Sequence, residues 1–408
     1  MSEAAPPPGE LFAAFPSATP ADWAAAARAS LGGRPLESLA GATADGLPRQ
    51  PIYGPECEEG LPHLRLRDPA ACAPAPGWEI RQRPCSATAA ALRAELGELA
   101  AWGQRVLPLE VERLAGSELS ELLAGMNLPG VVIELETARP ALSARLLGGR
   151  ADRTLLADWL GSALTDGRKW PGAAGELAGL WSANLPAHWR AGAAAAHEAG
   201  ATPAQELALW LAAWTAGLRE LEEAGAPLET ALARARHELA ADHRVFDTIA
   251  KLRAARLLAA RLLEACGLPP RQRAIRLEAR GTQRGWTREE PWNNLLRATL
   301  QGFAAVAGGA QALHLPAMDE GLEDEGEGAR ARRLAFNVQA ILREEAQLAR
   351  TADPGRGSWY LESLGAALAE KAWSLFQQIE GAGGLWAALG RGLPQGWIRA
   401  SAAAEAHT

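Results

Sequence analysis

Cysteine is scarce in this 408-residue chain, and the few cysteines form no recognisable pattern. There is no C-x-x-C pair, and no histidine stands near a cysteine at the spacing of a zinc site. We therefore expect free thiols, as is usual in a reducing cytoplasm. The four cysteines are Cys57, Cys72, Cys85 and Cys266.

Long apolar runs and an excess of positive charge are also missing. The strongest apolar run, Leu207 to Leu218, stops at Arg219 and is shorter than the ~20 residues that span a bilayer. The first residues, Met1 to Pro8, lack the basic and apolar regions of a signal peptide. A net charge of −7 gives no attraction to nucleic acid or anionic membrane. We expect a cytoplasmic protein whose partners are small molecules or proteins.

Common catalytic motifs are absent. The sequence has no G-x-G-x-x-G after a strand, no G-x-x-x-x-G-K-[ST], no H-E-x-x-H and no G-x-S-x-G. The acidic run Asp319 to Gly328 lacks the regular ligand spacing of a calcium loop, so we interpret it as a solvated loop.

Residues 1–76 look like an N-terminal arm without a core of its own. Thr19 and Pro20 predict the start of a short helix that ends before Gly32 and Gly33. The remainder is rich in proline and glycine and shows no sustained periodicity. Its apolar side chains need another surface, which we expect a partner chain to provide. They are Phe12, Phe15, Trp23, Leu31, Leu36, Leu39, Ile52 and Tyr53.

Strands and helices alternate from Trp78 onward. Alternating βα units predict an α/β fold, a (β/α)8 TIM-type barrel that is partly degenerate because fewer than eight strands are clear. We place this barrel at residues 77–394 and a tail at 395–408. The expected strands are 105–112, 130–136, 177–183, 273–280 and 310–315; the expected helices are 117–126, 203–224, 227–241, 244–266, 291–307, 329–348 and 362–380.

The C-terminal half carries a series of short motifs in a fixed order. This series resembles the substrate-binding barrel of the adenosylcobalamin-dependent methylmalonyl-CoA mutases and related acyl-CoA mutases. The resemblance covers residues 10–390 and is most specific after Glu198. The motifs include Gly285-Trp286-Thr287, Glu290-Pro291-Trp292-Asn293-Asn294, Gly308 to His314, Met318-Asp319-Glu320, Asp353-Pro354 and Gly357-Ser358-Trp359-Tyr360.

Several site positions depart from those of the family's catalytic chains. A Tyr-His pair of the catalytic chains is replaced by Ala194-Ala195, and a tyrosine that shields the radical pair is replaced by Arg83. An arginine that binds the CoA phosphate becomes Glu278, whose charge would repel the phosphate, and a nearby serine becomes Gly281. The resemblance therefore implies a small, non-catalytic chain.

Other positions keep residues of the family pattern. They are vestigial substrate-binding candidates, whose alternative role is inherited scaffold: Gln311, His314, Glu345, Arg81 and His197. We expect no catalytic residue and no metal ligand in this chain. The cobalt-binding pattern Asp-x-His-x-x-Gly is absent, and the residues after Pro394 are too few for a flavodoxin-like cobalamin domain. Either the lineage lost that domain or the sequence stops short of it.

The resemblance implies the small subunit of a heterodimeric methylmalonyl-CoA mutase, which interconverts succinyl-CoA and (R)-methylmalonyl-CoA by a radical rearrangement. Its partner would be a large catalytic subunit that holds adenosylcobalamin and the acyl-CoA. One alternative is the acyl-CoA-binding chain of a split cobalamin-dependent mutase. Another is a stand-alone barrel that binds a different ligand.

Overall fold

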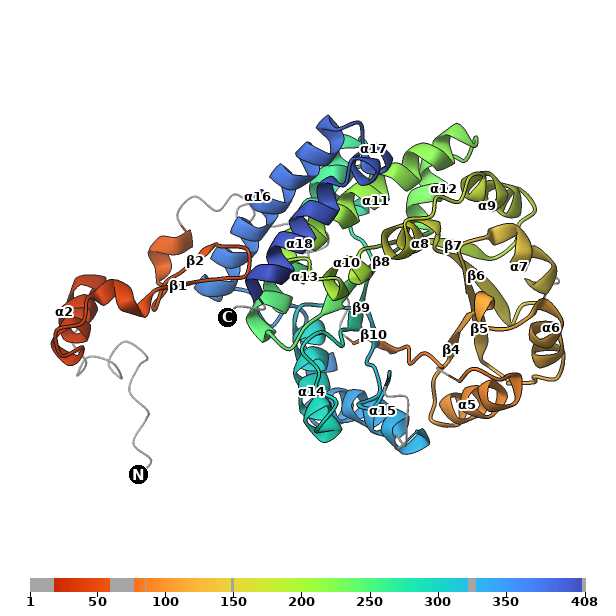
Figure 1. Ribbon diagram of the computed structural model, residues 1–408, viewed down its shortest axis with the longest axis horizontal. Helices are drawn as coiled ribbons and strands as arrows, with labels where there is room; N and C mark the ends of the chain where they lie inside the picture. The colour runs from red at the N-terminus through yellow and green to blue at the C-terminus, as the bar shows by residue number, and fades with distance from the viewer. Residues whose placement is uncertain (1–17, 59–76, 85, 148–149, 322–327, 406–408) are drawn as a thin grey trace, which may run out of the picture.

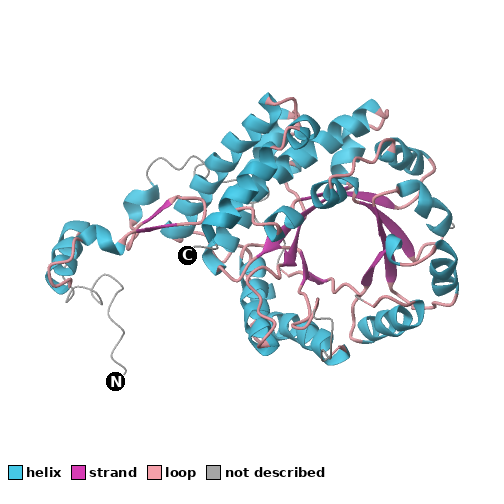
Figure 2. Ribbon diagram, viewed as in Figure 1, coloured by secondary structure: helices cyan, strands magenta, loops and turns pink. Residues whose placement is uncertain are grey.

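Eight parallel strands form a curled sheet with helices outside it, so the expected TIM-type barrel is confirmed (Figures 1 and 2). The computed structural model describes residues 18–58, 77–84, 86–147, 150–321 and 328–405. The strand order is β3-β10-β9-β8-β7-β6-β5-β4. The strands are β3 Glu79–Ile80, β4 Val106–Glu110, β5 Val132–Thr137, β6 Arg153–Ala157, β7 Ala187–Gly192, β8 Ala235–Ala241, β9 Leu277–Gly281 and β10 Ala312–His314.

Alternation along each strand separates an apolar outer layer from a charged interior. On β5, Ile133 and Leu135 join the apolar core beneath the helices, whereas Glu134 and Glu136, which alternate with them, are buried carboxylates. Successive side chains of a strand point to opposite faces, so both carboxylates lie on the inner face of the barrel. The alternation of residues along the strand therefore places ionisable side chains in the barrel interior.

The helices form one layer around the barrel and a second layer over part of it. α16 packs on both α11 and α13, which explains why α11 is buried on almost every face. The helices are α5 Ala89–Ala101, α6 Gly116–Ala124, α7 Pro140–Leu147, α8 Trp159–Asp166, α9 Ala173–Ser182, α10 Ala194–Glu198, α11 Pro203–Glu223, α12 Leu228–Ala233, α13 Val245–Ala265, α14 Pro291–Ala307, α15 Ala329–Glu344, α16 Trp359–Gly381, α17 Leu385–Gly390 and α18 Leu393–Glu405. No helix in the described ranges is long and apolar enough to cross a membrane.

A glutamine side chain closes the barrel where β3 and β4, the two ends of the sheet, meet. The Gln104 side-chain amide donates to the backbone oxygens of Gln82, at 2.9 Å, and Val106, at 2.8 Å. Its Oε1 accepts from the Gln82 backbone nitrogen at 3.0 Å. Because Gln104 is buried, these bonds replace the missing strand ladder rather than compete with water.

The arm extends from the barrel and is held at its base by a hairpin (Figure 1). The arm helix α2, Pro20–Ser30, has the expected Thr19 cap and buries none of its residues. A hairpin of β1, Gly41–Ala42, and β2, Pro48–Arg49, follows it. In the hairpin loop, buried Asp45 accepts from the Thr202 hydroxyl at 2.5 Å, where Thr202 caps α11. The hairpin is thus fixed to the barrel, while the arm helix is not.

Two sequence-based element assignments were wrong. Residues 177–183, expected as a strand, belong to helix α9, whose alanines and leucines favour a helix. Residues 227–241, expected as one helix, divide into α12 and strand β8. The alanines of 235–241 suggested a helix, but burial between β7 and β9 overrides that propensity. The expected tail begins within α18, which packs on the barrel through Arg284 and Glu405.

Candidate functional site: the barrel interior

Ion pairs fill the half of the barrel interior that lies nearer the amino ends of the strands. The guanidinium of Arg81, which follows β3, lies 2.7 Å from Glu134 on β5 and 3.1 Å from Glu278 on β9. Arg236 on β8 lies 3.5 Å from the same Glu278 carboxylate. The position that would repel a CoA phosphate is therefore neutralised by arginines of this chain.

A second layer of ion pairs lies nearer the carboxyl ends of the strands. Arg83 contacts Glu136 at 3.0 Å and Glu238 at 2.9 Å. Arg190 on β7 contacts Glu136 at 2.8 Å and Asp158 at 3.0 Å. The free space among these side chains is about 10 Å³, roughly what one water molecule requires. These ion pairs, together with the layer below, are called the ion-pair plug.

Mutual attraction holds Glu136 and Arg190 of the plug in their charged forms although both are buried. Burial alone would raise the pKa of Glu136, but the charges of Arg190 and Arg83 outweigh it and hold that pKa well below its ordinary value. Burial would likewise lower the pKa of Arg190, and the carboxylates of Glu136, Glu238 and Asp158 raise it instead. A carboxylate and a guanidinium that are both charged lock each other in one geometry.

A cavity of about 580 Å³ opens above the plug at the mouth of the barrel. Arg83, Arg190 and His314 belong to its lining, together with Ala194 and Ala195 on α10. The Nδ1 of His314 accepts from the backbone nitrogen of Arg83 at 3.3 Å. Burial, reinforced by the charges of Arg83 and Arg280, lowers the pKa of His314 well below its ordinary value. A neutral imidazole that is already hydrogen-bonded is thus held at the rim of the plug.

The structure brings only some of the candidate residues together. Arg81, Arg83, Glu278 and His314 lie inside the barrel, and Ala194 and Ala195 lie at its mouth. Gln311 lies at the opposite end, where its Oε1 accepts from the Leu277 backbone nitrogen at 3.2 Å. Glu345 caps the end of α15 and is exposed.

Gly281 is packed so closely that it leaves no room for a side chain. A Cβ atom there would lie 2.7 Å from Pro316 and 2.8 Å from Gln301, far inside normal contact. The site around β9 has therefore repacked around a glycine. A serine at this position requires neighbouring side chains to move.

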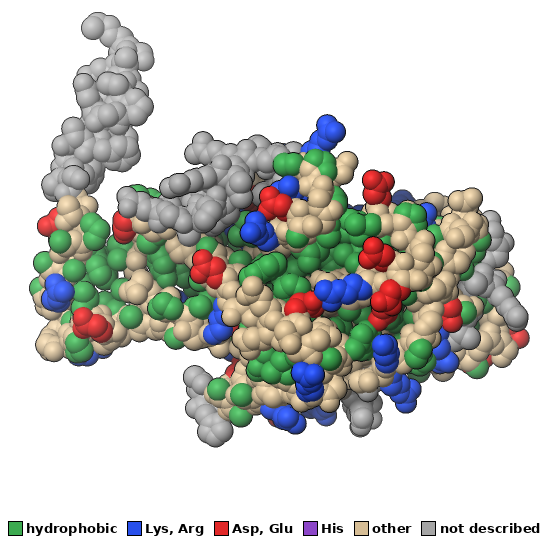
Figure 3. Space-filling model, turned by 90° about the horizontal axis from the view of Figure 1, so that it is seen from above, with side chains coloured by type: hydrophobic (Ala, Val, Ile, Leu, Met, Phe, Trp, Pro, Cys, Tyr) green, Lys and Arg blue, Asp and Glu red, His purple; other side chains and the backbone are tan. Residues whose placement is uncertain are grey.

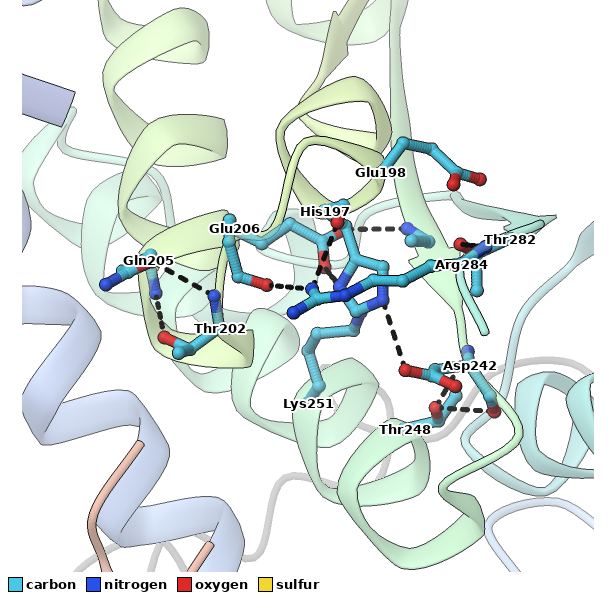
Figure 4. Close-up of polar contacts among 12 residues, drawn as sticks. His197, Glu198, Thr202, Gln205, Glu206, Asp242, Thr248, Lys251, Thr282 and Arg284 are labelled. Atoms are coloured by element: carbon cyan, nitrogen blue, oxygen red, sulfur yellow. Dashed lines mark hydrogen bonds and ion pairs between the residues drawn. The ribbon is translucent and has the colours of Figure 1, made fainter. Parts of the chain in front are cut away.

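His197 lies outside the barrel interior, in a buried charged cluster between α10, α11 and α13 (Figure 4). Its Nδ1 is 3.2 Å from Glu206 and its Nε2 is 3.3 Å from Asp242. Lys251 lies 2.5 Å from the same Glu206 oxygen. These four side chains, with His243 beside Asp242, are called the His197 cluster.

The two carboxylates of the cluster decide the charge of His197. Burial and the charge of Lys251 favour the neutral imidazole, but hydrogen bonds to Asp242 and Glu206 outweigh them and raise the pKa of His197. Those same contacts hold the pKa values of Asp242 and Glu206 below their ordinary values despite burial. The imidazolium therefore donates from Nε2 to Asp242, and its Nδ1 lies in ion-pair contact with Glu206.

This arrangement predicts a pH-dependent contribution of His197 to stability. A pKa raised on folding stabilises the folded chain fully below the unfolded value of about 6.5, and the gain is lost as the pH rises through the folded value. We expect the free energy of unfolding of the wild type to exceed that of His197→Gln most at pH 5–6. The difference should shrink toward pH 9. Urea titrations across this pH range measure it.

His188 provides a control with the opposite sign. Burial and the charge of Arg236 lower its pKa to about 4. The stability that depends on neutral His188 is therefore lost as the pH falls below about 6.5. The free energy of unfolding of the His188→Gln variant should therefore rise relative to that of the wild type as the pH falls toward 5. A His197→Gln profile parallel to the wild type would contradict an imidazolium in the cluster.

Sequence analysis missed the partners that complete the plug. Glu134 and Glu136 alternate with apolar residues in an expected strand, and this period of two was a usable signal for an inward charge. Arg190 and Glu238 gave no such signal, because β7 was not recognised and β8 was expected to be helical. Their meeting depends on the order of strands around the barrel.

Comparisons with known proteins agree with the sequence motifs. A sequence model of the methylmalonyl-CoA mutase family matches residues 190–408. The methylmalonyl-CoA mutase small subunit of Streptomyces virginiae is 38% identical over 387 residues, covering 88% of this chain and 61% of that protein. A probable small subunit of Mycobacterium bovis is 34% identical over 392 residues, covering 87% of this chain and 62% of that protein.

A large subunit is also similar to this chain. The methylmalonyl-CoA mutase large subunit of Streptomyces virginiae is 36% identical over 208 residues, covering 50% of this chain and 28% of that protein. The chain thus spans about three fifths of the length of the small subunits it matches. Among solved structures, dihydropteroate synthase of Xanthomonas albilineans aligns at 15% identity with a TM-score of 0.33, covering 66% of this chain and 94% of that one.

Proposed function

The chain belongs to the methylmalonyl-CoA mutase family, and from this premise we propose that it is the small, non-catalytic subunit of a heterodimeric mutase. The partner is a large subunit that binds the acyl-CoA and adenosylcobalamin and performs the rearrangement. This chain stabilises that partner. The relatives that cover most of this chain are named as small subunits, which supports the assignment.

The ion-pair plug is the observation that carries this proposal. A barrel that binds an extended acyl-CoA along its axis needs open space among its strands. Here Arg83 and Arg190 occupy that space, each held by two carboxylates. Clearing the axis would require breaking buried ion pairs, which costs about 3–5 kcal/mol for each charge left without its partner.

The retained family residues fit an inherited scaffold better than a substrate site. Gln311 binds the start of β9, and Glu345 is exposed at the end of α15, so neither reaches the mouth cavity. His197 is committed to its own cluster of carboxylates. We therefore assign them structural or vestigial roles in this chain.

The residues at the barrel mouth do not fit a cobalamin. The imidazole that lines the cavity, His314, is buried and already accepts a backbone hydrogen bond at Nδ1. Arg83 and Arg190 form a charged cavity floor, where an apolar corrin face would find no complementary surface. We derive no chemical step through cobalamin on this chain and place the cofactor on the large subunit.

The arm supports a partner-binding role. Leu39 and Ile52 are 41% and 48% exposed, and α2 buries no residue against the barrel. Figure 3 shows apolar side chains distributed along the part of the arm that the structure describes. We propose that this arm wraps the large subunit, whose surface covers these side chains.

Reconstitution with the large chain encoded in the same genome tests the proposal. We expect a one-to-one complex that converts methylmalonyl-CoA with added adenosylcobalamin, whereas this chain alone shows no turnover. Removing residues 1–40 should weaken association at least tenfold, or about 1.4 kcal/mol, because the arm no longer contributes apolar contact. Sedimentation or calorimetry gives the dissociation constant.

The truncation is designed to leave the barrel intact. It keeps the hairpin at residues 41–49, whose Asp45 contacts the cap of α11, so the melting temperature should match that of the full chain. The circular dichroism should lose only the helical signal of α2. An unchanged dissociation constant would contradict the role of the arm. Turnover by this chain alone would contradict the non-catalytic assignment.

A further inference from the structure

Most arginines that line the mouth cavity already have partners in this chain. Two of them belong to the ion-pair plug, and Arg113 contacts Glu110 at 2.9 Å. The guanidinium of Arg139 lies 4.8 Å over the ring of Trp170. Arg280, near the carboxyl end of β9, makes no hydrogen bond and no ion pair with any residue that the structure describes. The cavity lining therefore includes a guanidinium whose donors are free for a ligand.

The imidazole of His314 supplies a second donor without a partner. Its Nδ1 accepts from the backbone nitrogen of Arg83, so the neutral ring carries its proton on Nε2. No acceptor for that proton lies in the described ranges of the chain. His314 is 6% exposed and lines the cavity, so the open space beside its ring is that of the cavity. A buried donor without an acceptor is unfavourable, and a ligand oxygen would satisfy it.

Strand register brings these two donors together. Arg280 and His314 are paired residues of β9 and β10, and neighbouring strands lie about 4.8 Å apart. Each alternates with a residue of the outer apolar core, Ala279 or Leu313, so both side chains start from the inner face of the barrel. A guanidinium fork and an imidazole N–H at one level of the barrel present several donors to the same group. This donor set is suited to an oxyanion.

The rest of the lining favours a singly charged anion with a compact apolar body. Glu136 and Glu238 also line the cavity. Burial would raise the pKa values of both carboxyls, but the arginines of the plug hold them below their ordinary values. These charged carboxylates repel a phosphate dianion more strongly than a carboxylate, whose two oxygens match the guanidinium fork. Buried Ala138 and Ala194 leave room and apolar surface for the body of such an acid.

Glu320 is the group of this chain that competes for Arg280. It lines the cavity, and its Oε2 accepts from the backbone nitrogen of Ala317 at 3.2 Å. Burial raises the pKa of Glu320, and the charge of Arg280 opposes that rise. The two side chains attract each other but form no ion pair in the described part of the chain. A ligand carboxylate therefore binds Arg280 without displacing an existing ion pair.

We propose that the mouth cavity binds a small monocarboxylic acid, whose carboxylate accepts hydrogen bonds from the Arg280 guanidinium and from Nε2 of His314. The acid enters from the mouth, because the ion-pair plug leaves only about 10 Å³ of free space within the barrel below. All of these groups belong to this chain, so the site is tested without a large subunit and does not depend on the proposed function.

Calorimetry of the full chain with benzoate tests the site. Benzoate carries one carboxylate on a flat apolar body, and benzamide has the same shape without the charge. At constant ionic strength, benzamide should bind at least tenfold more weakly than benzoate, because it offers no charge to Arg280. Arg280→Gln should weaken benzoate binding at least tenfold for the same reason. Glu320→Gln should strengthen benzoate binding about threefold, because a competing carboxylate is lost.

Two further variants separate a defined site from general attraction. Arg139→Gln is the matched control, since it removes one positive charge from the same lining, and it should change the dissociation constant less than twofold. His314→Asn keeps an acceptor near the position of Nδ1 for the Arg83 backbone but removes the Nε2 donor, so it should weaken binding about threefold. In the wild type, benzoate should shift the ¹⁵N resonance of His314 Nε2.

Each outcome decides for or against the site. Equal weakening by Arg280→Gln and Arg139→Gln would show general attraction to positive charge and overturn the proposal. Tighter binding of inorganic phosphate than of benzoate would overturn the assignment to carboxylic acids. The site is likewise rejected if neither benzoate nor acetate gives a heat of binding or shifts the His314 resonance. Matching melting temperatures among the variants exclude a folding defect.

Discussion

The variant Arg190→Met should lose about 3–5 kcal/mol of unfolding free energy, the usual cost of leaving buried charges without their partner. Arg190 lies within 3.0 Å of both Glu136 and Asp158 and is almost completely buried. Methionine fills similar space but carries no charge, so the carboxylates of the plug remain in a low-dielectric interior. Urea or guanidinium unfolding at neutral pH measures the loss.

Arg150 provides the control for this prediction. It pairs with Asp152 at 2.8 Å, the same distance as from Arg190 to Glu136, but the side chains of Arg150 and Asp152 are both exposed. Solvent screens such a pair, so Arg150→Met should leave stability unchanged within error. A small effect of Arg190→Met would show that water enters the plug, which would also weaken the case against acyl-CoA binding in this barrel.

Replacing Lys251 by methionine should also destabilise the chain by about 3–5 kcal/mol. The Lys251 ammonium is buried 2.5 Å from Glu206, which His197 also contacts. Without the lysine, two buried carboxylates, Glu206 and Asp242, share one imidazolium. We expect Glu206→Gln to recover part of the loss in the Lys251→Met background, because a neutral amide can still accept from the Ala240 backbone nitrogen.

Lys169 provides the control for the Lys251→Met variant. Lys169 is exposed and lies 5.0 Å over the ring of Trp386, so Lys169→Met should cost little. Thermal and urea unfolding of the three variants give the differences. If the double variant is no more stable than Lys251→Met alone, the loss comes from packing and not from an uncompensated carboxylate.

Local sequence patterns accounted for much of the fold. The Thr19 cap, the 203–223 helix and the 291–307 helix follow from capping residues and periodicity that operate within a few turns. Strand β8 could not be found in this way, because residues 235–241 are rich in alanine and become a strand only through burial between two others. Helix propensity therefore gave the wrong assignment for residues 235–241, because tertiary contacts determine the conformation of this segment.

For the candidate site, too, some features followed from the sequence and others only from the tertiary structure. By itself the sequence determined the family, the altered positions Arg83, Glu278 and Gly281, and the apolar character of the arm, because residue identity and short spacings carry that information. Only the tertiary structure decided that Arg83 and Arg190, 107 positions apart in the chain, fill one barrel interior. Closure of a parallel sheet sets which inward side chains meet, and that depends on strand order and stagger, which no local pattern encodes.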